Sequence, residues 1–250
     1  MFVLLALVFA GGFVFLGVGS GNSGLQNFFS DVFNGGGGSG PSVSKALKAT
    51  EKNPADAKAW RDLASAYETK NRTDDAIAAL QRYTELRPKD PKGLADLGGL
   101  QLAQAGDLQT QASAVQAEQQ DAFAATQFGP NPSSTIGKAF GTDPIQSAVS
   151  SDINTRSGDV YSRMQSAYSS AVATYQKLAK LRPNDQETQL RLAQAAESAN
   201  QIPVAVKAYK RFVQIDPTNA LVPQVKARIE QLQPKPVKKK PSKNKKGGSG

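Results

Sequence analysis

Residues 57 to 88 read A-K-A-W-R-D-L-A-S-A-Y-E-T-K-N-R-T-D-D-A-I-A-A-L-Q-R-Y-T-E-L-R-P. In the first half, four residues have the i, i+3, i+4, i+7 spacing of one helix face: Trp60, Leu63, Ala64 and Tyr67. The second half carries Ala76 and Leu80 at helical spacing and ends at Pro88. Because a proline after such a pattern ends a helix, the stretch predicts two helices joined by a short turn.

Four prolines indicate that this unit is repeated along the chain. Pro54 and Pro88 are 34 residues apart, as are Pro183 and Pro217. Pro88 and Pro183 are 95 residues apart, which is one period plus 61 residues, so one repeat carries an insertion. A fixed period in this range is typical of a solenoid of stacked helix pairs.

The residues between these prolines resemble the tetratricopeptide repeat family, in particular bacterial membrane-anchored members. The first unit follows the family pattern W-x2-L-G-x2-Y, A-x3-F and P, with Ala64 in place of glycine and Leu80 in place of phenylalanine. The second and third units repeat the pattern with Leu94, Leu97, Gly98, Ala171, Tyr175 and Pro183, and with Leu192, Ala193, Ala205, Tyr209, Phe212 and Pro217. The resemblance implies an all-α fold, a helical-hairpin solenoid over residues 42–233.

Residues that favour helix starts support these boundaries. Asp56, Asp90 and Asp185 stand where N-caps are expected, and Pro91 and Pro203 fit the first turn of a helix. A half-unit at 42–52 and a last helix at about 221–232 would close the two ends of the solenoid.

The insertion covers about residues 107–166. Its first part is rich in helix formers, and we expect a helix that starts at an Asp107 cap. A loop with Ile136, Phe140 and Ile145 follows, and then a long helix with one apolar face: Val160, Met164, Ala167, Ala171, Tyr175 and Leu178. The apolar loop residues allow two interpretations, a cover over repeat surface or an element that binds a partner.

The N-terminal segment predicts a membrane anchor. Residues 1–20 are apolar or small, no charge precedes Asp31, and a helix of the first 19 residues would rise roughly 28 Å, enough to span a bilayer. A cleaved signal peptide and a buried helix are the alternatives, although a basic start and an A-x-A site are missing. Residues 21–41 are a Gly/Ser-rich linker, and the G-x-G-x-x-G at 19–24 lacks the strand and acidic residue of a dinucleotide site.

The side of the membrane is not given by flanking charges, because none lies near the span. A basic segment upstream of Met1 would place the N-terminus in the cytoplasm. We therefore expect a single-pass membrane protein whose repeats lie outside the cytoplasm.

The net charge of +9 belongs mainly to residues 234–250. Subtracting the seven lysines of this tail leaves +2 for the rest of the chain. With prolines and nothing to bury, the tail is predicted to be disordered, and it could bind anionic lipid, a wall polymer or another polyanion. Its lysines are Lys235, Lys238, Lys239, Lys240, Lys243, Lys245 and Lys246.

Composition argues against an enzyme. Cysteine and histidine are both absent, which removes thiol nucleophiles, zinc fingers and the commonest general base. The carboxylates Glu68, Asp96 and Glu187 would need strongly shifted pKa values to act as a pair, and they lie among lysines and arginines. We expect no catalytic residue, metal, cofactor or small-molecule substrate.

The resemblance also implies where a partner binds. In this family the first helix of each repeat lines a concave groove, and positions 2, 5 and 9 commonly face a peptide. Lys58, Arg61 and Lys92 would form a cationic end that binds an acidic segment, unless they are ordinary solvated charges. The predicted groove residues are Lys58, Arg61, Ser65, Lys92, Gly99, Glu187 and Gln194, with Ala95 and Leu190 at the remaining positions.

These features together predict a membrane-anchored scaffold that binds protein or peptide partners, in the cell envelope. The alternative is an adaptor that binds polyanions or anionic lipid through the lysine-rich tail. Salt distinguishes the two, because contacts with apolar groups survive salt that abolishes tail binding.

Overall fold

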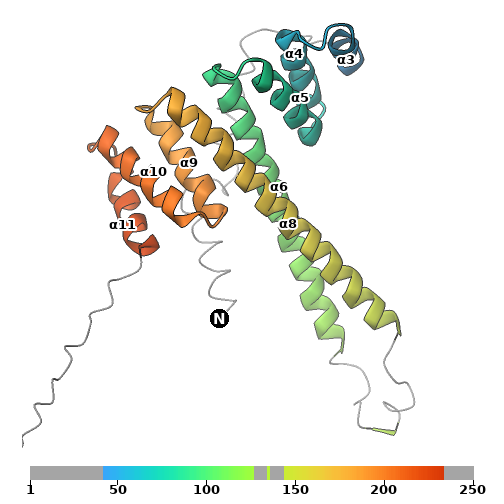
Figure 1. The fold of residues 1–250 in the computed structure, drawn as a ribbon. Helices are drawn as coiled ribbons and strands as arrows, with labels where there is room; N and C mark the ends of the chain where they lie inside the picture. Colours follow the sequence, from blue (N-terminus) through green and yellow to red (C-terminus); the bar gives the residue numbers. More distant parts are fainter. Residues whose placement is uncertain (1–41, 127–133, 136–143, 234–250) are drawn as a thin grey trace, which may run out of the picture. The chain divides into compact units, whose positions relative to one another are not determined.

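The computed structural model describes residues 42–126, 134–135 and 144–233, and helices make up nearly all of this part of the chain (Figure 1). No strand occurs in these ranges. The helices are α3 (Val43–Lys52), α4 (Ala57–Glu68), α5 (Thr73–Leu86), α6 (Pro91–Thr126), α8 (Pro144–Leu181), α9 (Gln186–Ser198), α10 (Ile202–Ile215) and α11 (Val222–Leu232). The predicted all-α class is confirmed for these residues.

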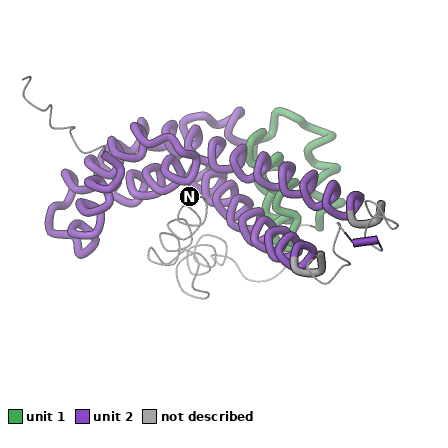
Figure 2. Tube along the Cα trace, turned by 90° about the horizontal axis from the view of Figure 1, so that it is seen from below, with its two compact units in different colours: residues 1–82 green, residues 83–250 purple. Residues whose placement is uncertain are grey.

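The chain divides into two compact units, residues 1–82 and 83–250 (Figure 2). Within the first unit α3 packs against α4. Four motif residues of the first repeat are buried: Leu63, Ala64, Ala76 and Leu80. The indole N–H of Trp60, another motif residue, donates to the carbonyl of Pro54 at 2.9 Å. The apolar spacing that predicted two helices here therefore marks their packed sides.

The expected N-caps are confirmed. The Asp56 carboxylate accepts from the Lys58 N–H at 2.9 Å, and Asp185 accepts from the Thr188 N–H at 3.0 Å. Asp90 accepts from the N–H of Lys92 at 3.0 Å. Each aspartate satisfies a donor that the first helical turn leaves without a partner, which explains why the helices begin where they do.

The turns inside two of the repeats share one conformation. Asn71 follows α4 with φ 55°, and Asn200 follows α9 with φ 57°. Asparagine tolerates this left-handed region better than most residues, and a helix often ends with such a residue. The two asparagines occupy equivalent places in the 34-residue period, so the repeat extends into its turns.

The second unit is organised around α6 and α8, which lie side by side along much of their length in both views (Figures 1 and 2). The expected helix start at Asp107 is wrong, because α6 runs through this residue from Pro91 to Thr126 without a break. Ala105, Leu108, Ala112 and Val115 are all buried on one side of α6. Because this apolar face continues across Gly106 and Asp107, the helix has a packed partner throughout and no reason to end.

Residues beyond the repeat proper form a two-helix arm, made of the α6 segment 107–126 and the α8 segment 144–166. The Arg156 guanidinium bridges the helices through Glu118 at 2.6 Å and also pairs with Asp152 at 2.8 Å. Nearer the repeats, the Tyr168 hydroxyl donates to the Gln109 side chain at 3.2 Å. The insertion is thus helical on both sides of residues 127–143.

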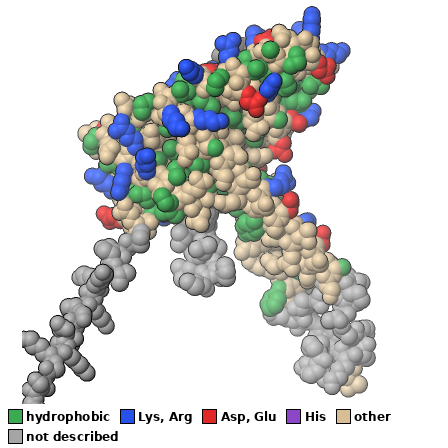
Figure 3. All heavy atoms as spheres, in the orientation of Figure 1, with side chains coloured by type: hydrophobic (Ala, Val, Ile, Leu, Met, Phe, Trp, Pro, Cys, Tyr) green, Lys and Arg blue, Asp and Glu red, His purple; other side chains and the backbone are tan. Residues whose placement is uncertain are grey.

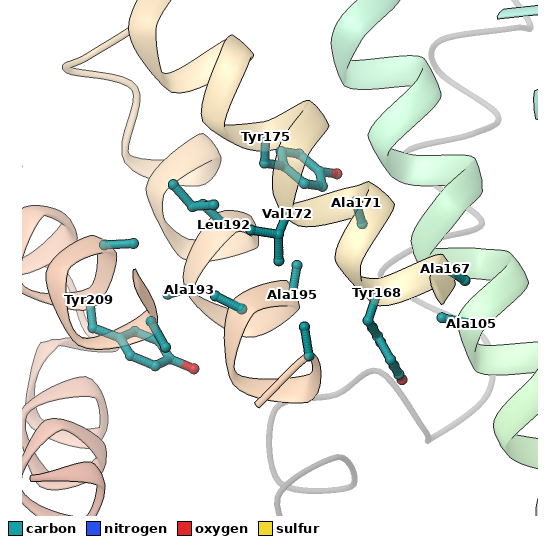
Figure 4. Packing of buried hydrophobic residues seen from close by; sticks show 14 of the residues in the cluster. Ala105, Ala167, Tyr168, Ala171, Val172, Tyr175, Leu192, Ala193, Ala195 and Tyr209 are labelled. Carbon is teal, nitrogen blue, oxygen red and sulfur yellow. The ribbon is translucent and has the colours of Figure 1, made fainter. Parts of the chain in front are cut away.

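One continuous core joins α6, α8, α9, α10 and α11 (Figure 4). Tyr168, Val172, Tyr209 and Phe212 are among its most completely buried side chains, and alanines fill the places between helices. The apolar face predicted for α8 is confirmed, with Met164 only partly buried. Buried Thr174 also donates to Gln101 at 2.8 Å, so this polar pair is satisfied.

The last three helices are also linked by polar contacts. Arg228 of α11 donates from Nε to the Glu197 carboxylate of α9 at 2.8 Å. The Tyr209 hydroxyl of α10 donates to the other oxygen of Glu197 at 3.0 Å. Because the two donors use both carboxylate oxygens, one partly buried charge connects three helices.

The predicted anchor 1–20, linker 21–41, loop residues Ile136 and Phe140, and tail 234–250 lie outside the described residues. Among the helices that the structure describes, none is long and apolar enough to cross a bilayer.

Three glycines predict opposite effects of the same substitution. A Cβ at Gly98 would lie 2.9 Å from two carbons of the Tyr175 ring, whereas at Gly106 and Gly158 nothing lies within 4 Å. We expect Gly98→Ala to lower the free energy of unfolding by about 1–3 kcal/mol through overpacking. Gly106→Ala and Gly158→Ala should each raise it by about 0.5–1 kcal/mol, because alanine favours the helix. Chemical denaturation measures all three, and a stabilising Gly98→Ala would contradict the close packing.

Candidate partner-binding surface

In the first helix of each repeat, some side chains are buried in the core and others are exposed at the surface. In α6, Leu94, Leu97 and Gly98 are buried, whereas Lys92 is exposed. The motif residues therefore form the core. Lys92, at position 2 of its repeat, stays accessible, as the predicted groove requires. The other predicted positions differ in how far they reach the surface.

On α4 the predicted residues are one exposed and two half-buried side chains. The Lys58 side chain is 78% exposed and its Nζ lies 2.6 Å from Asp62. The hydrogen bond to Asp62, with the charge of that carboxylate, raises the pKa of Lys58. Arg61 and Ser65 are half-buried. The positive charge of Lys58 thus already has a neighbour, although an exposed pair of this kind contributes only about 0–1 kcal/mol.

On α6 the predicted residues have different environments. The Lys92 side chain is exposed at the helix start, and Ala95 is half-buried against the core. Gly99 is buried and has no side chain to offer a partner. Because Lys58 and Arg61 lie in the first unit and Lys92 in the second, the predicted cationic end spans both units and stays a prediction.

On α9 the predicted positions form a mixed polar and apolar strip. Glu187 is exposed and its carboxylate lies 3.5 Å from Arg191. Gln194 is half-buried, and Leu190 between them is partly buried against the core. This strip offers one apolar and two polar side chains to a ligand.

Tyr175 of α8 packs beside Gly98 of α6 and interacts electrostatically with Glu187 and Arg191 of α9. Its ring fills the space beside Gly98, and Figure 4 shows it extending from α8 toward α6. Burial raises the pKa of Tyr175 to about 12, opposed by Arg191 and assisted by Glu187 and Asp96. The charges of α6 and α9 thus act on one buried hydroxyl.

The three carboxylates considered for catalysis are in different environments. Glu187 pairs with Arg191, Asp96 is buried on α6, and Glu68 lies on α4 in the other unit. Within the described ranges, no three acidic side chains come close enough together to hold a metal ion.

A second surface, which the sequence analysis missed, is a groove of about 920 Å³ lined by α8, α9 and α10. Four cations line it: Lys180, Lys207, Lys210 and Arg211. The i, i+3, i+4 spacing of the last three was visible in the sequence and places them on one side of α10. What the sequence could not supply was Lys180, which approaches them only when α8 and α10 both pack on α9.

The comparison with family models agrees with the repeat pattern. A tetratricopeptide repeat model matches residues 43–91 and 156–220, on either side of most of the arm. No curated protein matches the chain. The chain is a tetratricopeptide repeat protein, a class whose stacked helix pairs in general form surfaces for protein–protein interaction.

Several solved structures are also similar to this chain. A crystal structure of MamA is 16% identical with a TM-score of 0.25, covering 70% of this chain and 86% of that one. TTC0263, a thermophilic TPR protein of Thermus thermophilus, is 15% identical with a TM-score of 0.24, covering 76% and 88%. YrrB, described as a TPR protein with an unusual peptide-binding site, is 16% identical with a TM-score of 0.27, covering 76% and 86%. The family assignment rests on the family model and the repeat pattern.

The buried tyrosine predicts a loss of stability at high pH. Because the pKa of Tyr175 in the folded chain is about 12 and that of an unfolded tyrosine is about 10, its contribution is complete below about pH 10 and is lost as the pH rises toward 12. We expect the Tm of Tyr175→Phe to fall less steeply over this interval than that of the unchanged protein. Part of the dependence of Tm on pH should remain in this variant, because burial also raises the pKa values of Tyr168 and Tyr209. The control is Tyr161→Phe at an exposed tyrosine, and equal slopes in both variants would contradict the burial argument.

Proposed function

We propose that this protein is a membrane-tethered scaffold that binds a protein or peptide partner along the first helices of its repeats. The observation that carries the proposal is the difference in burial along α6 and α9. The motif residues of these helices are buried, whereas Lys92, Leu190 and Gln194 reach the surface. Repeats of this kind contact only their neighbours and so leave one extended side available to a ligand.

The charges of this surface favour an acidic partner segment. Lys92 is exposed, and Lys58 has Asp62 as its partner in an exposed pair. Because such a pair contributes little, a carboxylate of the partner could replace Asp62 at small cost. Leu190 of α9 would add an apolar contact, so binding would not depend on electrostatics alone.

The tether would keep the repeats close to the bilayer. A Gly/Ser-rich linker of the length of 21–41 reaches on average about 25 Å from the end of the anchor. We propose that the repeats lie outside the cytoplasm and act on envelope partners. The second candidate function is polyanion binding by the tail, which the seven lysines after Pro234 favour.

A photoreactive amino acid in place of Gln194 tests the partner-binding side in cells. We expect it to form an adduct with a defined protein, identified by mass spectrometry, whereas the same label at exposed Glu230 of α11 should not. Changing Lys58, Arg61 and Lys92 to Glu should weaken the Gln194 adduct about tenfold, because favourable charge pairs become repulsive.

The matched control for these charge reversals changes exposed Lys48, Lys52 and Lys70 to Glu and should leave the adduct unchanged. An adduct that is equally strong at Glu230, or that ignores the groove charges, would overturn the proposal that the first helices bind the partner.

Deletion of residues 1–20 tests the tether, and we expect it to release the protein from the membrane fraction because the apolar span is removed. Since the chain has no cysteine, Ser249→Cys provides a single thiol, which a membrane-impermeant maleimide should label on intact cells. Labelling only after lysis would place the repeats in the cytoplasm.

Removal of residues 234–250 separates the second candidate function from the tether. Membrane association of the deletion variant that survives high salt supports the anchor, whereas loss of association on removal of the tail would favour polyanion binding.

A further inference from the structure

The groove between the second helices of two successive repeats is separate from the surface proposed above. It lies between the end of α8 and the side of α10, and α9 supplies Gln189 and Leu192 between them. Both residues are buried, so they form its floor. None of the seven predicted groove residues lines it.

The rim of this groove is positively charged without compensation. No acidic side chain is among the residues that line it. Lys180, Lys207 and Lys210 reach the surface, and none of them takes part in an ion pair within the described part of the chain. Figure 3 shows lysine and arginine side chains gathering over the part of the molecule where Figure 1 labels α10.

Arg211 is held in place at the edge of the groove. Its Nε donates to the carbonyl of Pro183 at 3.3 Å, and a terminal nitrogen donates to Asn184 Oδ1 at 2.6 Å. Both acceptors are uncharged, so the guanidinium keeps its full positive charge. A fixed arginine loses less conformational freedom on binding a carboxylate than a freely rotating one.

Apolar side chains lie in the floor and walls of the groove, and they select among anionic ligands. Leu192, Val204 and Ala208 lie between the cations. A free phosphate would leave these apolar side chains uncovered, and a nucleic acid strand would lack aromatic side chains on which to stack, since none lines the groove. A peptide that alternates acidic and apolar side chains satisfies both features, and the volume suits a short segment.

The remaining parts of this chain do not have the charge to fill the groove. The tail 234–250 carries seven lysines, residues 1–41 contain a single acidic residue, Asp31, and residues 127–143 contain one aspartate and one lysine. Like charges disfavour the tail, and the other segments have too few carboxylates to match four cations. None of these three segments is complementary to the groove in charge, so we take its occupant to be a segment of a partner protein.

We propose that the groove of α8, α9 and α10 binds an acidic, partly apolar peptide segment of a partner protein. Carboxylates of this segment pair with Lys180, Lys207 and Lys210 at the rim, while an apolar side chain rests on Leu192. The two proposed surfaces share α9 but use different residues of it, because Leu190 and Gln194 belong to the first surface whereas Gln189 and Leu192 form the floor of this groove.

Selection of a random displayed peptide library against the full chain tests this proposal. We expect enriched peptides to contain Asp or Glu beside Leu, Ile or Phe. A fluorescein-labelled enriched peptide should bind about tenfold more weakly to Lys207→Glu/Lys210→Glu, because two attractive pairs become repulsive. Leu192→Ala, which shortens the floor, should weaken binding at every salt concentration.

The matched control is Lys45→Glu/Lys48→Glu on α3, which changes net charge equally at exposed lysines outside the groove. Circular dichroism checks that each variant is folded, and the variant with Lys58, Arg61 and Lys92 changed to Glu should keep full affinity, so this test can fail independently of the proposed function. Enriched peptides without acidic residues, or unchanged binding to Lys207→Glu/Lys210→Glu, would overturn the proposal.

Two further measurements examine other occupants. Flotation with equal parts of phosphatidylglycerol and phosphatidylcholine should not depend on Lys207 and Lys210, and light scattering should give the same mass for the unchanged protein and the double variant. Loss of vesicle binding, or of a dimer, in the double variant would assign the groove to lipid or to a second copy instead.

Discussion

Close approach of neighbouring helices is the constraint on which the second unit depends. Gly98 leaves room for the Tyr175 ring, and Ala171, Ala193 and Ala205 are completely buried where helices pack. A small residue on one helix lets the aromatic side chain of the next fill the core at native density. The same approach brings the rim of the α8–α10 groove together, so the charged surface is a consequence of how the core is packed.

Much of the helical order followed from local signals in the sequence. Asp56, Asp90 and Asp185 predicted helix starts because a capping carboxylate acts within three residues of itself. The continuation of α6 through Asp107 could not be predicted in this way. An aspartate after a glycine looks like a cap, and only the packing of Leu108 and Ala112 against α8 shows that the helix continues.

The candidate surfaces were predictable to different degrees. The accessibility of Lys92 and Glu187 follows from their place in the period, whereas the ion pair of Lys58 with Asp62 and the burial of Gly99 depend on local geometry and packing. The cations of the basic groove come from two helices, α8 and α10, that are separated in sequence, so a pattern along the chain does not show that they meet. The two proposed surfaces on one short solenoid suit a protein that holds partners together.

The arm has a consequence for how the chain reaches its fold. Gln101 and Thr174, which pair the two helices of the middle repeat, are 73 residues apart. Closing a loop of that length costs conformational entropy, and this cost slows folding. Contacts of shorter separation lie at the base of the arm, where 59 residues separate Gln109 and Tyr168, and along the arm, where 38 separate Glu118 and Arg156. If α6 and α8 first pair at the arm, each contact shortens the loop that the next contact must close. The insertion, which interrupts the repeat in sequence, would then help the two helices of that repeat to pair.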